Sequence, residues 1–168
     1  MAFFILADVK SDRLTYKKFT EQDINDCLSW YTDDQVMRYI KGRAMTIAEA
    51  ESRFSEIIKV NQEKGIPGFY GVYIKTQFIG IAKLTHLSAS ELEVGYGLLV
   101  PFWGYGYASE MIGAMIDSSQ NIKQVSKLTG IVNKENHASV ALLKKHGFKF
   151  ISEKAEHNII QCYYSRKP

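Results

Sequence analysis

Residues 93–110 read EVGYGLLVPFWGYGYASE, and this order predicts a strand, a glycine-rich turn and the start of a helix. Val94, Leu98 and Val100 are typical strand residues. Pro101 follows them, and because proline cannot donate a hydrogen bond to a neighbouring strand, we expect the strand to stop there.

Gly104 and Gly106 allow a tight turn in which main-chain N–H groups converge without side chains in the way. We expect the next helix to begin near Tyr107, with its unpaired first-turn N–H groups and the positive end of its dipole facing the turn. Such a turn is an anion site, above all for phosphate. The alternative is a strand–helix connection whose glycines only permit close packing, and the glycines alone do not decide between the two.

Composition limits the class of protein. The chain has 168 residues, 46% of them hydrophobic and 23% charged, which is ordinary globular usage and predicts a single domain over residues 1–168 with a core at roughly 13–165. The net charge of +3 is spread along the chain, which argues against nucleic-acid binding. No run approaches membrane-spanning length. The two cysteines lie far apart and outside any metal-ligand spacing, so we expect no metal site and a cytoplasmic protein with reduced thiols.

Hydrophobic periodicity predicts the remaining elements. We expect further strands at residues 13–19, 69–74, 78–84, 127–132, 148–152 and 159–164, and helices after Thr20, after Thr46, from Tyr107 and over 137–146. Residues 33–39 fit either a short helix or a loop, and residues 85–90 are expected to form a polar turn. This order predicts an α/β protein with a mixed sheet of about seven strands and about four covering helices, in which the strands from Glu93 and Lys127 pair in parallel.

Three segments together resemble the GNAT superfamily of acyl-CoA-dependent N-acetyltransferases, and its ribosomal-protein N-terminal acetyltransferase branch most closely. The matching positions are Glu93, Gly95 and Tyr96, then residues 104–108 with Glu110, then Asn136, Ser139, Gly147 and Phe148. The resemblance covers roughly residues 13–165. It implies the acyl-CoA N-acyltransferase (GNAT) fold and acetyl-CoA as cosubstrate.

In this family acetyl-CoA lies where two parallel strands separate. The resemblance therefore assigns the pantetheine arm to the main chain of Leu98, Leu99 and Val100. It assigns the pyrophosphate to the amides of the turn, which are those of Trp103, Gly104, Tyr105, Gly106, Tyr107, Ala108 and Ser109. The family pattern has Arg or Gln three residues before the first glycine, where this chain has Pro101, so one side-chain contact is lost while the amides remain.

The resemblance also implies catalytic roles. Glu93 is the expected base that takes the amine proton, the alternative being an exposed strand carboxylate. Asn136 is expected to bind the pantetheine and Ser139 to lie beside the sulfur and donate to the leaving thiolate, the alternative for both being helix capping. Many relatives carry a tyrosine acid where this chain has Leu143, and Tyr96 or Tyr164 could donate instead.

The sequence therefore predicts an acetyl-CoA-dependent N-acetyltransferase, an acyltransferase that acts on a primary amine. The acceptor is expected to be a protein N-terminal α-amine or a small amine, drawn to the acidic Asp33 and Asp34. The alternative is a non-catalytic acyl-CoA-binding sensor. A thioesterase is disfavoured because no nucleophile elbow is present. We expect no nucleic acid and no membrane as partner and a monomer or homodimer; the acceptor's identity stays open.

Overall fold

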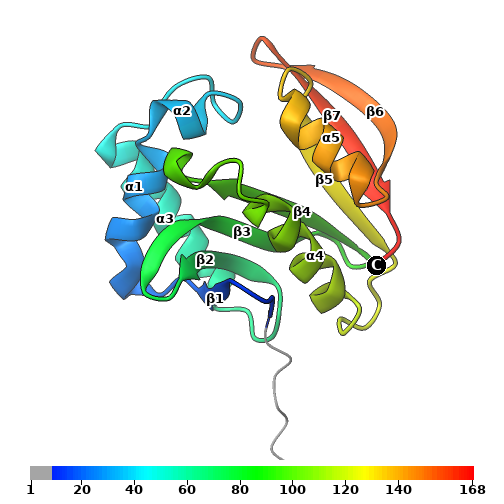
Figure 1. Cartoon of the computed structure of the whole chain (residues 1–168), viewed down its shortest axis with the longest axis horizontal. Coiled ribbons are helices and arrows are strands. Elements are labelled where there is room, and N and C mark those ends of the chain that lie inside the picture. Colours follow the sequence, from blue (N-terminus) through cyan, green and yellow to red (C-terminus); the bar gives the residue numbers. More distant parts are fainter. Residues whose placement is uncertain (1–8) are drawn as a thin grey trace, which may run out of the picture.

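A computed structural model describes residues 9–168 as a seven-stranded sheet with helices on both faces (Figure 1). The strand order is β1-β2-β3-β4-β5-β7-β6. The strands are β1 (Thr15–Lys18), β2 (Gly68–Ile74), β3 (Gln77–Ser88), β4 (Glu91–Leu98), β5 (Lys127–Asn133), β6 (Lys149–Glu156) and β7 (Ile159–Arg166). The helices are α1 (Ile24–Tyr31), α2 (Asp34–Met37), α3 (Ile47–Asn61), α4 (Tyr107–Ser119) and α5 (His137–Lys145), with 3-10 turns η1 (Glu21–Asp23) and η2 (Val100–Phe102).

The sheet is mixed, as the sequence predicted. β4 and β5 pair in parallel, and every other neighbouring pair is antiparallel, including the expected hairpin of β2 and β3. The helix after the glycine turn begins at Tyr107, as expected, and crosses from β4 to β5. Among residues 9–168, no helix is long and apolar enough to cross a membrane.

Two features around β4 differ from the sequence prediction, and one open alternative is decided. Residues 85–88 are not a turn, because they continue β3 and pair with the start of β4, with Thr85 opposite Glu93; only Ala89 and Ser90 form the turn. β4 ends at Leu98, since Val100 already belongs to η2 with Pro101. Residues 34–37 form the short helix α2, which the Asp33 side chain caps by accepting hydrogen bonds from two main-chain amides.

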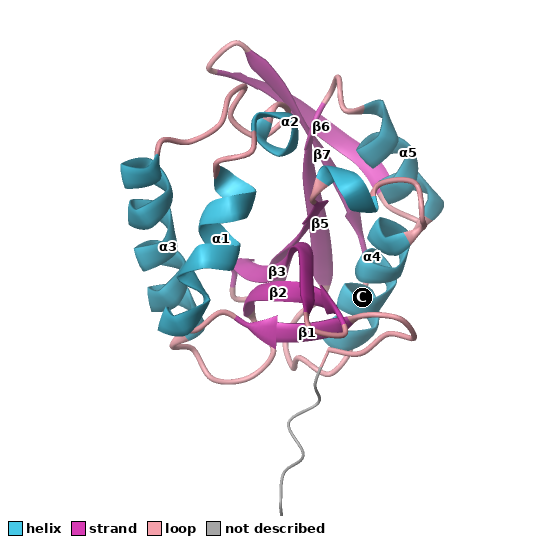
Figure 2. Cartoon of the chain, turned by 60° about the vertical axis from the view of Figure 1, so that its left-hand side comes forward, coloured by secondary structure: helices cyan, strands magenta, loops and turns pink. Residues whose placement is uncertain are grey.

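The two faces of the sheet carry separate cores (Figure 2). α4 packs on one face, where Leu92, Val94 and Leu98 of β4 meet the helix residues Met111 and Met115. α1 and α3 pack on the other face around Trp30, Ile57 and Phe69. Side chains alternate along β4, so even-numbered residues point to the α4 face and odd-numbered ones to the α1 face.

β4 and β5 separate halfway along their length. Their register contains only three pairs, which end at Glu93 with Thr129, although β4 continues to Leu98 and β5 to Asn133. The two strands diverge from this point (Figure 1). The sheet therefore opens between its fourth and fifth strands, and β5, β7, β6 and α5 form the far side of the opening.

We predict that Gly80→Ala destabilises the sheet beside this opening. Gly80 lies opposite Leu98, and a Cβ there would collide with the main-chain oxygen of Gly97. We expect the free energy of unfolding to fall by about 2 kcal/mol, as for overpacking in a core. Gly113→Ala in α4 is the control, because a Cβ there meets no heavy atom nearer than 4.0 Å. Alanine favours a helix over glycine, so this variant should raise the free energy of unfolding by about 0.5–1 kcal/mol. Urea unfolding measures both, and a Gly80→Ala variant as stable as the wild type would contradict the prediction.

Candidate active site

The glycine turn leaves the start of α4 uncapped. Gly106 is the N-cap residue with φ of 81°, a left-handed conformation, and no side chain caps the helix. Gly104 has φ of 85°, and nothing lies within 4 Å of where its Cβ would be. The first amides of α4 and the positive end of the helix dipole therefore face an open turn, which suits an anionic group.

Arg13 holds this turn in place, a role that sequence reasoning missed. The Arg13 main-chain N–H and Nε donate to the two carboxylate oxygens of Glu110, each at 2.7 Å. Its Nη1 donates to the main-chain oxygen of Tyr105 at 3.0 Å. The guanidinium carbon also lies 4.5 Å from the centre of the Tyr107 ring. Burial would raise the pKa of Glu110, but hydrogen bonds from Arg13 and Ser11 outweigh it, so its pKa lies below the ordinary range.

The Ser109 side chain links α4 to α5. Its Oγ lies 2.8 Å from Nε2 of His146, the residue that ends α5. Burial, together with the positive charges of Lys145 and Arg166, lowers the pKa of His146. The ring is therefore neutral at neutral pH, so the Ser109 contact adds no charge at the start of α4. The main-chain amide of Ser109 faces the turn with the other first-turn amides.

The main chain at the end of β4 presents an unpaired edge to the opening. Leu99 N donates to Ile79 O in β3 at 2.8 Å. Because main-chain groups alternate sides along a strand, Tyr96 and Leu98 direct theirs away from β3, toward the side from which β5 has separated. The Leu98 oxygen already accepts from the Trp103 indole N–H at 2.8 Å. A ligand with its own amides could pair with this edge as a further strand would.

Glu93 is a largely buried, ion-paired carboxylate. Its Oε1 lies 2.7 Å from Nζ of Lys83 on β3, and the two side chains are 17% and 23% exposed. The alternative of an exposed strand carboxylate is therefore wrong. Glu93 points to the α1 face, and it stands at the last residue pair before β4 and β5 separate.

Asn136, Ser139 and Tyr96 come together on the other face. Asn136 caps α5, since its Oδ1 accepts from Ser139 N at 3.2 Å. The Tyr96 hydroxyl donates to the main-chain oxygen of Ser139 at 3.3 Å. Burial raises the pKa of Tyr96 to about 12, although a hydrogen bond with the Ser139 side chain opposes the shift. Tyr96 therefore keeps its proton at neutral pH.

Glu93 points to the α1 face of β4, whereas Ser139 lies beside Tyr96, whose side chain points to the α4 face. Tyr164, the third candidate donor, is buried and packs against Phe150, so its ring belongs to the core.

Trp30 contributes an unsatisfied donor beside the opening. Its indole N–H is the one buried side-chain polar atom within residues 9–168 that lacks a hydrogen-bond partner. The ring lies against Gly97 of β4, on the same face as Glu93. A buried donor without a partner costs about 1–3 kcal/mol, so its place here fits a site at which another molecule supplies the acceptor.

Asp33 and Asp34 each hold main-chain amides through one carboxylate oxygen. Asp33 caps α2, and Asp34 accepts a hydrogen bond from Ala44 N at 2.7 Å. Both carboxylates shape the segment that follows α2, where Met37 O accepts from the amides of Ile40, Lys41 and Gly42.

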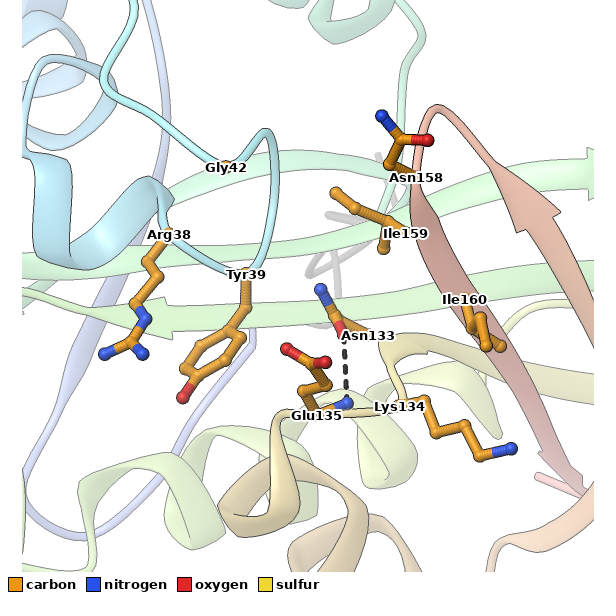
Figure 3. Close-up of a pocket in the computed structure, with 9 residues that line it drawn as sticks. All are labelled: Arg38, Tyr39, Gly42, Asn133, Lys134, Glu135, Asn158, Ile159 and Ile160. Atoms are coloured by element: carbon orange, nitrogen blue, oxygen red, sulfur yellow. Dashed lines mark hydrogen bonds between the residues drawn. The ribbon is translucent and has the colours of Figure 1, made fainter.

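This segment forms one wall of a pocket of about 290 Å³ that sequence reasoning missed (Figure 3). The other walls are the end of β5 and the turn between β6 and β7. We call it the hairpin pocket, and its lining residues are Arg38, Tyr39, Gly42, Asn133, Lys134, Glu135, Asn158, Ile159 and Ile160.

Residues 13–149 match the family described as "Acetyltransferase (GNAT) domain". The chain is 28% identical over 145 residues to the uncharacterized N-acetyltransferase YoaA of Bacillus subtilis (strain 168), which covers 84% of this chain and 82% of that protein. Two solved structures share the fold. One is a Salmonella typhimurium acetyltransferase that modifies the N-terminal serine of ribosomal protein L7/L12, with a TM-score of 0.79, 16% identity and coverage of 94% and 96%. The other is Vibrio cholerae spermidine N-acetyltransferase in complex with CoA and spermine, with a TM-score of 0.76, 18% identity and coverage of 92% and 95%.

The chain therefore belongs to the GNAT acetyltransferase family. It is an acetyl-CoA-dependent acetyltransferase that uses acetyl-CoA as its cosubstrate and transfers the acetyl group to an amine. Within residues 9–168, no group of three or more His, Cys, Asp or Glu side chains is arranged to hold a metal ion.

Proposed function

We propose that the acceptor is a protein N-terminal α-amine or, failing that, a small primary amine. The amine would approach from the Glu93 side of β4, and the thiolate would leave on the Tyr96–Ser139 side. One observation carries this proposal: the ion-paired Glu93 lies on one face and the Tyr96–Ser139 contact on the other, where the β4–β5 pairing ends. The Salmonella relative that acts on an N-terminal serine and the Vibrio relative that acts on spermidine support the two acceptor classes.

Acetyl-CoA fits the opening by its chemistry. Its pyrophosphate would bind the amides of residues 103–109, which include the uncapped start of α4. Its pantetheine amides would pair with the edge at residues 98–100, where the three main-chain oxygens accept from Trp103 Nε1, Phe102 N and Trp103 N. A second lone pair on each oxygen and the remaining amides are left for the ligand. Asn136 would add its amide N–H, because capping α5 engages its oxygen.

Transfer needs a neutral amine, so a proton must leave before the nitrogen attacks the thioester carbonyl. The C–N bond forms as the C–S bond breaks, and the thiolate takes up a proton. Glu93 would accept the amine proton, and Lys83 competes with the amine for its carboxylate. An α-amine titrates near pKa ~8, whereas a lysine amine titrates near ~10.4. Because Lys83 holds the Glu93 carboxylate, Glu93 would deprotonate an α-amine, which gives up its proton more easily, in preference to a lysine amine.

A panel of acceptors tests the proposed function. Peptides with free N-termini, their N-terminally blocked counterparts, spermidine and an aminoglycoside would each be mixed with acetyl-CoA, and free thiol would be followed with time. We expect turnover with free N-termini and none with blocked peptides that lack lysine. Acetyl-CoA binding without turnover on any amine would instead favour the non-catalytic sensor.

We predict that Glu93→Gln lowers kcat/KM by about 100-fold, the usual contribution of a general base. The loss should shrink at high pH, where the amine is already neutral. Thiol release between pH 6 and 9 measures it. Glu91→Gln is the control, because Glu91 lies two residues earlier on the same face and pairs with Lys127, yet should keep near wild-type activity. Full kcat/KM of Glu93→Gln across this range would eliminate Glu93 as the base.

We predict that Ser139→Ala lowers kcat about 10-fold and leaves acetyl-CoA affinity unchanged, if the Ser139 hydroxyl protonates the thiolate. Tyr96→Phe removes only the phenol oxygen beside Ser139, so its kcat reports whether Tyr96 supplies the proton instead. Single-turnover kinetics and calorimetry separate transfer from binding. Normal binding and wild-type turnover by Ser139→Ala would reject Ser139, and the same outcome for Tyr96→Phe would reject Tyr96.

A further inference from the structure

The hairpin pocket lies across the opening from the Glu93 strand. Asn133 ends β5 on one wall, and Arg38 and Tyr39 approach from the segment after α2 (Figure 3). The turn between β6 and β7 contributes Asn158 and Ile159. The walls thus come from both sides of the opened sheet, so a molecule held here would touch both.

Arg38 is a cation without a carboxylate partner. Within residues 9–168 its guanidinium forms no ion pair or hydrogen bond, and it lies only over the Tyr39 ring, at 5.3 Å from the ring centre. The neighbouring cations are satisfied, since Arg43 pairs with Glu49 at 2.8 Å and Lys134 pairs with Glu153 at 2.9 Å. Guanidinium groups are suited to carboxylates because their N–H groups form two parallel hydrogen bonds.

Asn133 adds a second donor. The residue is 9% exposed, and its Oδ1 accepts from Glu135 N at 2.9 Å. The amide nitrogen is therefore the end left for a ligand, and Figure 3 shows it on the side of Ile159, away from that hydrogen bond. Glu135 supplies the one carboxylate in the lining. The Arg38 guanidinium and the Asn133 amide nitrogen together offer more unpaired donors than Glu135 offers acceptors. The pocket therefore suits a ligand with carbonyl and carboxylate oxygens better than a polycation.

The position of the pocket sets the length of its ligand. Asn133 lies four residues beyond Thr129, the partner of Glu93, which is about 13 Å at ~3.3 Å per strand residue. The amine and carboxylate of one α-amino acid are only two bonds apart through Cα and cannot span this separation. An extended peptide advances by about the same ~3.3 Å per residue, so a carboxylate about four residues behind a reacting N-terminus would reach the pocket.

We infer that the hairpin pocket binds an acidic N-terminal peptide segment, with Arg38 pairing a carboxylate at about the fifth residue of the acceptor. This inference rests on the proposed acetylation of an N-terminal α-amine. Asn133 donates to a main-chain oxygen of the same segment, and Arg38 determines specificity without touching the reacting atoms.

Matched peptides test the inference. Four acceptors share one sequence and carry Asp at position three, four or five, or Asn at all three positions. We expect kcat/KM of the best Asp peptide to exceed that of the Asn peptide about 10-fold, the contribution of one charge-assisted hydrogen bond. Arg38→Gln should reduce the Asp peptide to the Asn level through KM and leave the Asn peptide unchanged. Lys59→Gln on α3 removes the same charge elsewhere as the control, and thermal melting verifies folding.

Each remaining outcome decides the inference. Equal rates for Asp and Asn peptides in the wild type, or an equal loss on both in Arg38→Gln, would overturn it. Spermidine or a free acidic amino acid turning over faster than every peptide would also overturn it. Calorimetry with a catalytically inert, N-acetylated Asp peptide separates this result from failure of the proposed function. Binding that depends on Arg38 supports the pocket even if no amine is acetylated, and Arg38-independent binding or none rejects it.

Discussion

The structure depends on the point at which β4 and β5 stop pairing, after Glu93 and Thr129. Strands inside a sheet normally form main-chain hydrogen bonds with a neighbouring strand on both sides. A buried N–H or C=O group without a hydrogen bond costs stability. Here β4 runs on to Leu98 and β5 to Asn133 without each other. The sheet tolerates the gap because each strand keeps its outer neighbour, β3 or β7, and because the core on the α4 face includes residues from both β4 and β5.

Local signals located the glycine turn well. Pro101 lies in η2 just after β4, and Gly104 and Gly106 take left-handed conformations before α4, so the sequence alone placed the turn although β4 ends two residues earlier than predicted. The hydrogen bonds from Arg13 to Glu110 that hold this turn could not be predicted from local sequence, because the two residues are 97 positions apart in the chain. The extension of β3 to Ser88 was missed for a related reason. Polar residues after Leu84 indicate a turn, whereas pairing with β4 makes them strand.

The proposed acceptor side depends on contacts that local sequence patterns do not show. Asp33 and Asp34 were expected to attract an amine, and each also binds main-chain amides through one oxygen, which shapes the segment that carries Arg38. Short acidic residues near a helix start cap it more readily than they bind ligands. The ion pair between Glu93 and Lys83 could not be predicted from the sequence either, because it depends on the register of β3 and β4.

Residue alternation along β4 also places the two proposed chemical roles on different faces. Alternation along β4 sends Glu93 to the α1 face and Tyr96 to the α4 face, so one strand cannot present both to one side. A thioester placed within the gap would be reached from both sides at once. Glu93 would then accept a proton from the amine on one face, and Ser139 or Tyr96 would donate a different proton to sulfur on the other, so the two transfers would need no shared group. The Lys83–Glu93 pair and the Tyr96–Ser139 contact can therefore be adjusted independently, the first by the acceptor and the second by the leaving thiolate.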